Sequence, residues 1–447
     1  MKITLIMPAV GQKQGEGYVD SWKMEPLSMA VLAGLTPDDI EVNFYDDRLE
    51  VIPYNEKTDL VAINVETYTA RRSYQIAANF RQRGVPVILG GYHPTLMPEE
   101  AAQFADSVLI GEAEDVWREA INDTKSKSVK KFYRSVQRPI LNGTKPRRNI
   151  FAGKRYIPIT LIESGRGCGF SCAFCSVTSF YKHSYNSRPI EEIVKEIELT
   201  RKKDIFFVDD NITADFVHAK KLFRALIPLK INWISQGSIN MATDEELLAL
   251  MKKSGCLGLL IGFESLNEEN LAQMGKSWNI RSGEYEIALR KFREIGIVIY
   301  GTFIFGYDGD TNDSIRKTLD FALNQKLFLA AFNHLVPFPG TPLYGQLESQ
   351  KRLLTEKWWL DANYKFGDVA FRPKNFTPQG LSDACMKARE DFYKLSSVLR
   401  RATDFQNNCR NLSMAVKYFV YNLFSQREIR NRQGLPLAEG LDSGNVK

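Results

Sequence analysis

The chain has 447 residues, 44% of them hydrophobic and 25% charged, and this length predicts two or three domains. No stretch approaches the roughly 18 consecutive apolar residues of a membrane-spanning helix. The opening MKITLIMPAV is typical of a short strand ended by Pro8 and not of a signal peptide, so we expect a cytoplasmic protein. The formal net charge of +6 is small and the basic residues form no long run, which argues against nucleic acid as a partner.

Short apolar runs alternate with helix-length segments over residues 1–125. This alternation predicts an α/β domain in which helices cover a parallel sheet. Residues 126–153 lose the periodicity and gain Lys, Arg and Pro, as a linker does. The predicted strands of the first domain are Ile3–Met7, Val42–Tyr45, Leu60–Val65, Val85–Leu89 and Val108–Ile110.

A second series of strands and helices occupies residues 154–345. Six predicted strands are each followed by a helix-length segment, which predicts a partial (β/α)6 barrel. A helix is expected after Pro189, because Ile190, Ile193 and Ile197 recur at helical spacing. The predicted strands are Ile157–Glu163, Ile205–Asp209, Asn232–Gln236, Leu257–Phe263, Val298–Phe305 and Phe328–Val336.

The rest of the chain is predicted to form a helical, aromatic-rich domain at residues 346–434 and a flexible tail at residues 435–447. A second helix of this domain is expected from Met414 to Arg430. The first helix should bury one face, formed by Leu381, Cys385, Ala388, Phe392, Leu395 and Leu399. The aromatic residues Trp358, Trp359, Tyr364 and Phe366 belong either to a core or to a pocket that stacks on a substrate ring.

Three of the six cysteines, Cys168, Cys172 and Cys175, fall within eight positions at the spacing Cys-x-x-x-Cys-x-x-Cys. In a reducing compartment such clustered thiols indicate a metal site and not disulfides. Three thiolates on one loop can each ligate one iron of a [4Fe–4S] cluster, which leaves the fourth iron without a protein ligand. That iron can chelate the amino and carboxylate groups of S-adenosylmethionine (SAM), whose one-electron reduction yields a 5′-deoxyadenosyl radical.

Two other metal sites are compatible with clustered cysteines. A structural zinc site needs four ligands, and the nearest additional donor, His183, lies at an unusual spacing. A ferredoxin-type cluster needs a fourth cysteine, but Cys256, Cys385 and Cys409 fit better as core thiols. A cluster with one open iron is therefore the leading interpretation, and a non-catalytic iron–sulfur or zinc protein is the alternative.

The cysteine motif, with Phe174 directly before its last cysteine, and the six βα units resemble the radical SAM superfamily over about residues 155–345. The resemblance implies an enzyme in which the three cysteines are the catalytic cluster ligands. It also implies that SAM contacts Phe174, Asp209, Asp210, Gln236, Ser238, Glu264 and Phe305. The residues alone leave other roles open, since Asp209 and Asp210 also suit a helix cap and Glu264 suits a salt bridge at a strand end.

Glycine-containing loops follow two predicted strands of the first domain, at Gly90-Gly91 and at Gly111. Glycines at the carboxyl ends of parallel strands let a ligand approach the backbone. Together with the segment Asn64–Arg71 and the barrel downstream, these loops resemble the Rossmann-like cobalamin-binding domain of cobalamin-type radical SAM enzymes over residues 1–125. The resemblance implies cobalamin contacts at Glu66, Thr67, Tyr68, Gly90, Gly91, Tyr92, His93 and Glu112.

The motif Asp-x-His-x-x-Gly, whose histidine ligates cobalt in many cobalamin proteins, is absent, and His93 is the only histidine of this domain. We therefore expect no histidine ligand and place Glu66, Thr67 or Tyr68 beneath the corrin. The alternative is an inherited domain that no longer binds cobalamin and instead binds substrate or serves as a scaffold.

With both cofactors bound, the resemblance implies methylation of an unactivated carbon, in which one SAM supplies the radical and another recharges cobalt with a methyl group. Rearrangement, cyclisation or epimerisation without methyl transfer is the alternative. We expect a small-molecule or lipid-like substrate and a reduced ferredoxin or flavodoxin as electron donor. The stretch Met414–Arg432 is apolar and basic, so a membrane contact is conceivable, although ordinary packing is the simpler interpretation.

Overall fold

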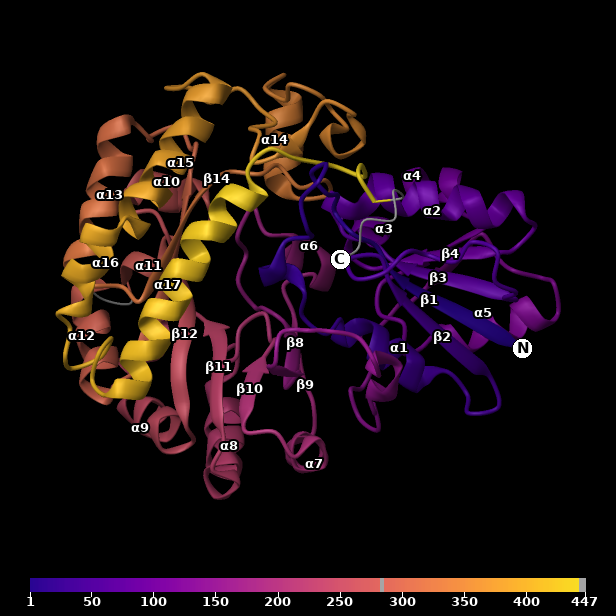
Figure 1. Ribbon diagram of the computed structural model, residues 1–447, viewed down its shortest axis with the longest axis horizontal. Helices are drawn as coiled ribbons and strands as arrows, with labels where there is room; N and C mark the ends of the chain where they lie inside the picture. Colours follow the sequence, from indigo (N-terminus) through magenta and orange to yellow (C-terminus); the bar gives the residue numbers. More distant parts are fainter. Residues whose placement is uncertain (282–284, 442–447) are drawn as a thin grey trace.

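The computed structural model describes residues 1–281 and 285–441, and it contains two six-stranded parallel sheets that lie side by side (Figure 1). The first sheet has the strand order β2-β1-β3-β4-β5-β6. This order reverses between β1 and β3, and ligands of such sheets bind at the carboxyl ends of the strands beside that point. The strands are β1 (Lys2–Met7), β2 (Glu41–Asp46), β3 (Leu60–Asn64), β4 (Val87–Gly90), β5 (Ser107–Ile110) and β6 (Phe132–Arg134).

Helices cover both faces of the first sheet, because its strands are apolar on both sides. Ile3 and Leu5 face one layer, which contains α1 (Leu27–Leu35) and α5 (Trp117–Lys125). Ile6 faces the opposite layer, which contains α2 (Ala70–Gln82) and α4 (Pro98–Phe104). The short helix α3 (Tyr92–Leu96) follows β4. The Rossmann-like architecture predicted for this part is confirmed.

The sixth strand of this sheet was missed by the sequence prediction. β6 lies inside residues 126–153, which were predicted to be a linker, and it pairs in parallel with β5. The side chain of Tyr133 is buried, but the basic residues Lys131 and Arg134 stand on either side of the apolar pair Phe132 and Tyr133. A strand of three residues between basic neighbours shows no periodicity, so its sequence is typical of a linker.

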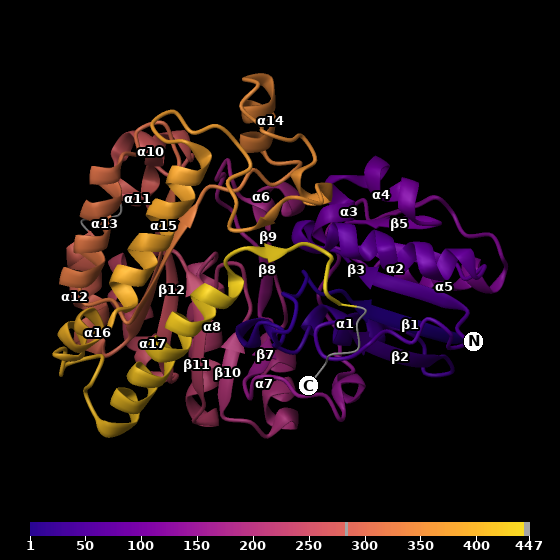
Figure 2. The same ribbon diagram turned by 45° about the horizontal axis from the view of Figure 1, so that its top comes forward.

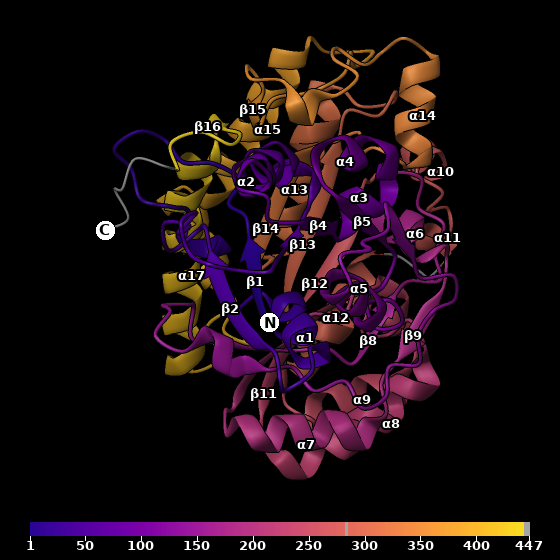
Figure 3. The same ribbon diagram turned by 90° about the vertical axis from the view of Figure 1, so that its right-hand side faces the viewer.

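The second sheet is the predicted open barrel, with the strand order β14-β13-β12-β11-β10-β7 and all neighbours parallel. Its strands are β7 (Thr160–Ile162), β10 (Asp204–Phe207), β11 (Asn232–Gly237), β12 (Cys256–Glu264), β13 (Val298–Phe305) and β14 (Leu329–His334). The covering helices are α7 (Ile190–Thr200), α8 (Phe216–Leu226), α9 (Glu245–Lys253), α12 (Tyr285–Ile295) and α13 (Asn312–Asn324). Figure 3 shows the first sheet in front of this barrel, with α7, α8 and α9 below.

One continuous core lies between the barrel strands and their helices. Phe263, Phe303 and Phe332 stack across β12, β13 and β14, with ring centroids 5.4 Å and 5.6 Å apart. Such stacked rings add to the stabilisation that their burial provides. The core thiols Cys256 and Cys385 are both buried, as predicted.

The predicted helix over residues 381–399 is in fact two helices. α15 (Pro378–Tyr393) and α16 (Leu395–Ala402) meet at Lys394, whose φ of −63° and ψ of 149° lie outside the helical region. Leu381 is buried as predicted, but Leu395 and Leu399 are 63% and 52% exposed. The break turns α16 away from the face that α15 buries, so these two leucines were assigned to the core wrongly.

The last long helix, α17 (Leu412–Arg432), extends the predicted helix by two residues at each end. Before α15, the helix α14 (Pro342–Ser349) leads into a segment that packs on the first sheet and its helices. Trp358, Trp359 and Tyr364 of this segment are buried in that core. The core interpretation of these three residues is therefore confirmed.

Residues 435–441 pack against the protein, which contradicts the predicted flexible tail, and residues 442–447 lie outside the described residues. β16 (Leu435–Pro436) pairs antiparallel with β15 (Lys365–Phe366), and Ala438 N donates to Val10 O at 2.7 Å. Leu437 is fully buried in the core beside the first sheet. The chain thus crosses from the barrel back to the first sheet near its C-terminal end (Figure 2).

Among the helices of the described residues, none combines the length and the apolar character needed to span a bilayer.

Leu437→Ala tests this packing of the C-terminal segment. Because the side chain is fully buried, its truncation should lower the free energy of unfolding by about 2–5 kcal/mol. Urea denaturation followed by tryptophan fluorescence measures the change. The matched variant Leu199→Ala removes a leucine that is 73% exposed and should change stability little. Equal stability of the two variants would show that residues 435–441 do not pack as described.

Candidate active site

The three motif cysteines lie on a loop at the carboxyl end of β7, between β8 (Gly165–Gly167) and α6 (Ser176–Tyr181). The loop is anchored by its backbone, since Ala173 N donates to Met274 O at 2.9 Å and Leu343 N donates to Ala173 O at 3.0 Å. Phe170 also stacks on Trp278 of α11 (Trp278–Arg281), with ring centroids 3.8 Å apart. These contacts hold the thiols beside the mouth of the barrel.

The thiols have the chemistry that a cluster requires. Cys168, Cys172 and Cys175 are free, and Cys172 is buried. Burial raises the pKa of Cys172 to about 12, while the nearby ammonium of Lys276 opposes this shift. Iron binding removes the thiol proton in spite of such a pKa.

No three His, Cys, Asp or Glu side chains of the described residues stand at the spacing of ligands around a single metal ion. This spacing does not exclude a cluster, because each thiolate of a [4Fe–4S] cluster ligates a different iron. The motif is therefore consistent with a cubane in which each of the three cysteines ligates one iron.

Two polar groups lie beside these thiols, Asn211 from the run Asp209–Asn211 after β10 and Lys276, which the sequence did not reveal. Asn211 Nδ2 approaches Cys168 Sγ at 3.8 Å and Ser238 Oγ at 3.2 Å. Lys276 is buried and pairs with Glu264 at 2.9 Å, which confirms the salt bridge considered for this glutamate. Asn211 follows β10, and Lys276 lies between α10 (Glu268–Gln273) and α11, so only the fold brings them to the cysteines.

The two aspartates after β10 point toward the segment that leads into the cysteine loop. Asp209 is buried and accepts hydrogen bonds from the backbone N and the hydroxyl of Ser164, and burial raises its pKa to about 7. Asp210 accepts from Gly167 N at 2.7 Å, and burial raises its pKa to about 6. The helix-cap alternative is wrong, because Asp215 caps α8.

The other residues predicted for SAM are spread over the barrel. Gln236 lies in β11 and is half-buried, and Ser238 directly follows that strand. Phe174 packs against the barrel core, and Phe305 is buried within it. Their contact with SAM stays a prediction.

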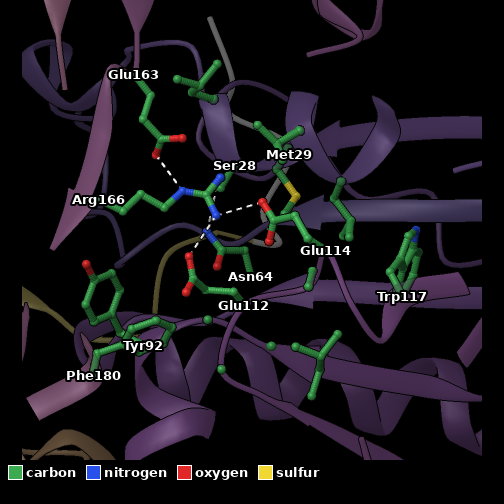
Figure 4. Close-up of a pocket in the computed structure, with 18 of the residues that line it drawn as sticks. Ser28, Met29, Asn64, Tyr92, Glu112, Glu114, Trp117, Glu163, Arg166 and Phe180 are labelled. Atoms are coloured by element: carbon green, nitrogen blue, oxygen red, sulfur yellow. Dashed lines mark hydrogen bonds and ion pairs between the residues drawn. The ribbon is translucent and has the colours of Figure 1, made fainter. Parts of the chain in front are cut away.

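A cavity of about 320 Å³ lies where the carboxyl ends of the two sheets meet (Figure 4). Its apolar wall comes from the first sheet and from α1 and α5, and includes Leu27, Val31, Leu32, Ile88, Leu109 and Trp117. Its polar wall comes from both sheets and includes Asn64, Glu66, Glu112, Glu114, Glu163, Arg166 and Asp210. A largely apolar pocket with a few converging polar groups is typical of a cofactor site.

Arg166 connects the two sides of this cavity. Its guanidinium pairs with Glu163 at 2.9 Å, with Glu112 at 3.1 Å and with Glu114 at 2.7 Å (Figure 4). Burial alone would lower the pKa of Arg166, but the surrounding carboxylates raise it well above its usual value. Arg138 adds a second cation on Glu112.

Tyr92 is a second connection between the sheets. It belongs to α3 after β4, and its ring lies 4.6 Å from that of Phe180 and 6.2 Å from that of Tyr181, both on α6. Helix α6 directly follows Cys175. The loop that follows β4 therefore packs on the helix that follows the cysteines.

Five of the eight residues predicted for cobalamin line the cavity: Glu66, Gly90, Gly91, Tyr92 and Glu112. The other three do not line it. The Nδ1 atom of His93 lies 3.4 Å from Thr67 Oγ1, and its Nε2 lies 3.1 Å from buried Glu100. Tyr68 packs on Trp358 with ring centroids 5.2 Å apart. Of the three residues expected beneath the corrin, Glu66 is thus the one in the cavity wall.

The glycine loops leave room in this cavity. A Cβ atom on Gly90 would meet only Leu109, at an ordinary 3.6 Å. Gly91 has a φ of +108°, and a Cβ there would lie 2.5 Å from Asn64 Oδ1, so no other residue fits without strain. The residues present therefore fit a large cofactor whose body approaches the backbone at the ends of β3, β4 and β5.

The parallel barrel with its three-cysteine loop and the adjoining Rossmann-like domain define a class of protein, the radical SAM enzymes with a cobalamin-binding domain. Two family models match the chain, the radical SAM superfamily at residues 162–322 and the B12 binding domain at residues 22–121. The bacteriochlorophyllide d C-12(1)-methyltransferase of Chlorobaculum tepidum is 31% identical over 90% of this chain and 89% of that protein. The chain belongs to the radical SAM superfamily, among its members with a B12 binding domain.

A second relative agrees with this assignment, and two solved structures share the fold. The bacteriochlorophyllide d C-8(2)-methyltransferase of the same organism is 26% identical over 88% of this chain and 90% of that protein. The cobalamin-dependent SAM radical enzyme OxsB has the same fold, with a TM-score of 0.67, 16% identity and coverage of 96% of this chain and 72% of that one. The methyltransferase TsrM from Kitasatospora setae has a TM-score of 0.62, 17% identity and coverage of 78% and 75%.

Membership of this family confirms the predicted fold class, the prediction of a radical SAM enzyme and its three cofactors, a [4Fe–4S] cluster, SAM and cobalamin. The roles of individual residues and the domain boundaries stay predictions.

The cluster ligands can be tested one at a time. Cys168→Ala, Cys172→Ala or Cys175→Ala should each abolish the formation of 5′-deoxyadenosine from SAM under dithionite, because each removes one of three iron ligands. Anaerobic reconstitution followed by iron analysis and chromatography of the products gives the measurement. The control Cys409→Ala alters a free cysteine outside the motif and should behave like the wild type. Normal cleavage in any of the three variants would contradict the assignment.

Proposed function

We propose that the protein is a cobalamin-dependent methyltransferase that acts on an unactivated carbon of a small molecule. The observation that carries the proposal is the shared cavity. Glu66, Gly90 and Glu112 from the cobalamin-type domain line it together with Arg166 and Asp210 beside the cysteine loop. A substrate at this junction would face both cofactors.

When bound, the cofactors supply a carbon-centred radical that abstracts hydrogen from the substrate and a methyl group that replaces it. The chain's own residues position these groups. The three cysteines hold the cluster, Tyr92 fixes α3 on α6, and Arg166 ties the cysteine loop to the first sheet. Position matters because a radical reaction requires its partners within contact distance.

For the individual contacts, we propose that SAM meets Asp210, Gln236, Ser238 and Glu264 on the barrel side. Support comes from their place at or after the carboxyl ends of β10, β11 and β12. For cobalamin we propose Glu66, Gly90, Gly91, Tyr92 and Glu112, with Glu66 beneath the corrin.

The proposed substrate is a ring-shaped, largely apolar molecule of the tetrapyrrole class. Support comes from the two relatives named above, whose names state that they methylate bacteriochlorophyllide d. A 23% identical relative from Rhodopseudomonas palustris is a hopanoid C-2 methylase, so a polycyclic lipid is the alternative. A reduced ferredoxin or flavodoxin is the proposed electron donor, since the cluster needs a strong one-electron reductant.

Ring formation without methyl transfer is the second candidate function. A relative from Cereibacter sphaeroides, an anaerobic magnesium-protoporphyrin IX monomethyl ester cyclase, is 26% identical over 80% of this chain and 63% of that protein. Its name states that this relative forms a ring, so cyclisation is the alternative reaction that we consider for the present chain.

The mass of the product separates these functions. With SAM that carries a deuterated methyl group and a chlorin substrate, methylation should add one labelled methyl group per turnover and form both 5′-deoxyadenosine and S-adenosylhomocysteine. Mass spectrometry of the reaction provides the measurement. A product that carries no label and has lost hydrogen would show that the enzyme catalyses cyclisation and not methylation.

Gly90→Leu tests the place of cobalamin. The new side chain fits the backbone at this position, since its Cβ meets only Leu109, but it fills the cavity. We expect the cobalt content after reconstitution with hydroxocobalamin to fall at least about tenfold while the iron content stays unchanged. In the matched variant Gly345→Leu the new Cβ has no neighbour within 4 Å, so both metals should be retained. Full cobalt content in Gly90→Leu would place the corrin elsewhere.

A further inference from the structure

Exposed apolar side chains are concentrated in one part of the surface. Sixteen large hydrophobic side chains are exposed among the described residues, and eight of them lie between residues 395 and 423. A single exposed leucine needs no explanation, but a contiguous apolar patch marks a contact with a membrane or with another protein.

Four of these side chains form a stripe along α17. Leu412, Val416, Val420 and Leu423 follow one another at intervals of four, four and three residues, which places them on one face of the helix. They are 82%, 54%, 56% and 54% exposed. The opposite face, with Met414, Tyr418 and Asn422, is buried. We call the four exposed residues the α17 stripe.

Helix α16 widens this apolar surface. Tyr418 donates to Val398 O at 2.8 Å, so the two helices pack together. Leu395 and Leu399 of α16 and Phe405 of the connecting loop are all exposed, Phe405 by 74%. Exposed apolar side chains thus lie on both helices and on the loop between them, and we call these residues, with the α17 stripe, the patch.

The charge on the two helices and their loop is mostly positive, although Asp391 and Glu428 flank this stretch and Asp204 lies near Tyr421. Residues 392–427 contain six basic residues (Lys394, Arg400, Arg401, Arg410, Lys417 and Arg427) and one acidic residue (Asp404). Asp404 and Arg401 are buried. Lys394 and Arg427 pair with Asp391 and Asp20, but within the described residues Arg400, Arg410 and Lys417 have no acidic partner within 4 Å.

We propose that the patch on α16 and α17 docks the protein on an anionic lipid bilayer, with the α17 stripe among the headgroups and Arg400 and Lys417 against lipid phosphates. An apolar helix face beside basic residues is the pattern of helices that lie in the membrane interface. A second copy fits less well, because a symmetric contact would bring the same positive charges together. The proposal does not depend on which reaction the enzyme performs.

Vesicle sedimentation with the full chain, reconstituted with its cluster, tests this docking. The wild type should sediment with vesicles of equal parts phosphatidylcholine and phosphatidylglycerol, and far less with phosphatidylcholine alone. The triple variant Val416→Ser/Val420→Ser/Leu423→Ser should lower the partition coefficient at least about tenfold, since it removes exposed apolar area without touching the core. Arg400→Gln/Lys417→Gln should lower binding to the anionic vesicles by about tenfold or more.

Leu199→Ser is the matched control, because Leu199 is 73% exposed on α7, outside the patch, and should bind as the wild type does. Thermal unfolding and iron content show that each variant keeps its fold. The proposal fails if the wild type stays in the supernatant with both vesicles, if it binds both equally, or if the triple variant binds as the wild type does. Light scattering can instead show a wild-type dimer that the triple variant makes monomeric. If the wild type also fails to bind vesicles, the patch contacts a second copy of the chain and not a bilayer.

Discussion

The ion cluster around Arg166 is the interaction on which the arrangement of the two sheets depends. Glu112 and Glu114 follow β5 of the first sheet, whereas Glu163 and Arg166 follow β7 of the barrel. Glu112 is buried and Glu114, Glu163 and Arg166 are half-buried, so removing one partner would leave a charge that little solvent can compensate. It holds the start of the cysteine loop directly against the carboxyl end of the first sheet.

This constraint explains why the proposed sites of the two cofactors lie side by side. Parallel sheets present their ligand sites at the carboxyl ends of their strands, and here the two carboxyl edges face each other. Tyr92 packing on α6 and the C-terminal segment crossing from the barrel to Leu437 add further contacts between the halves. A substrate between them would be close to both the cluster and the cobalt, which a methyl transfer to a substrate radical requires.

Much of this architecture could be predicted from the sequence, because the barrel strands are apolar runs at regular spacing and the cysteine spacing is specific. β13 was predicted at its observed bounds, Val298–Phe305. The break at Lys394 was missed because neither glycine nor proline marks it. The partners of Arg166 were missed because Glu112 and Glu114 lie more than 50 residues away in the chain, and only the fold brings them together.

The fold also decides which of the predicted cobalamin residues line the cavity and which point elsewhere. Gly90, Gly91 and Tyr92 were found because they follow a strand, and the structure places them in the cavity wall. His93 belongs to the same loop, but the helical turn of α3 directs it toward Glu100 in the interior. The sequence predicts which loop lies at the carboxyl end of the strand. The direction of each side chain depends on the backbone conformation of that loop, which the sequence pattern does not show.

A crystal structure of the anaerobically reconstituted protein with cluster, cobalamin and SAM would test the central claim most directly. The account predicts a cluster on Cys168, Cys172 and Cys175, and a corrin at the carboxyl ends of β3, β4 and β5, with both open to the cavity that Arg166 and Glu112 line. A corrin bound elsewhere, or a cavity closed between the two cofactors, would contradict it.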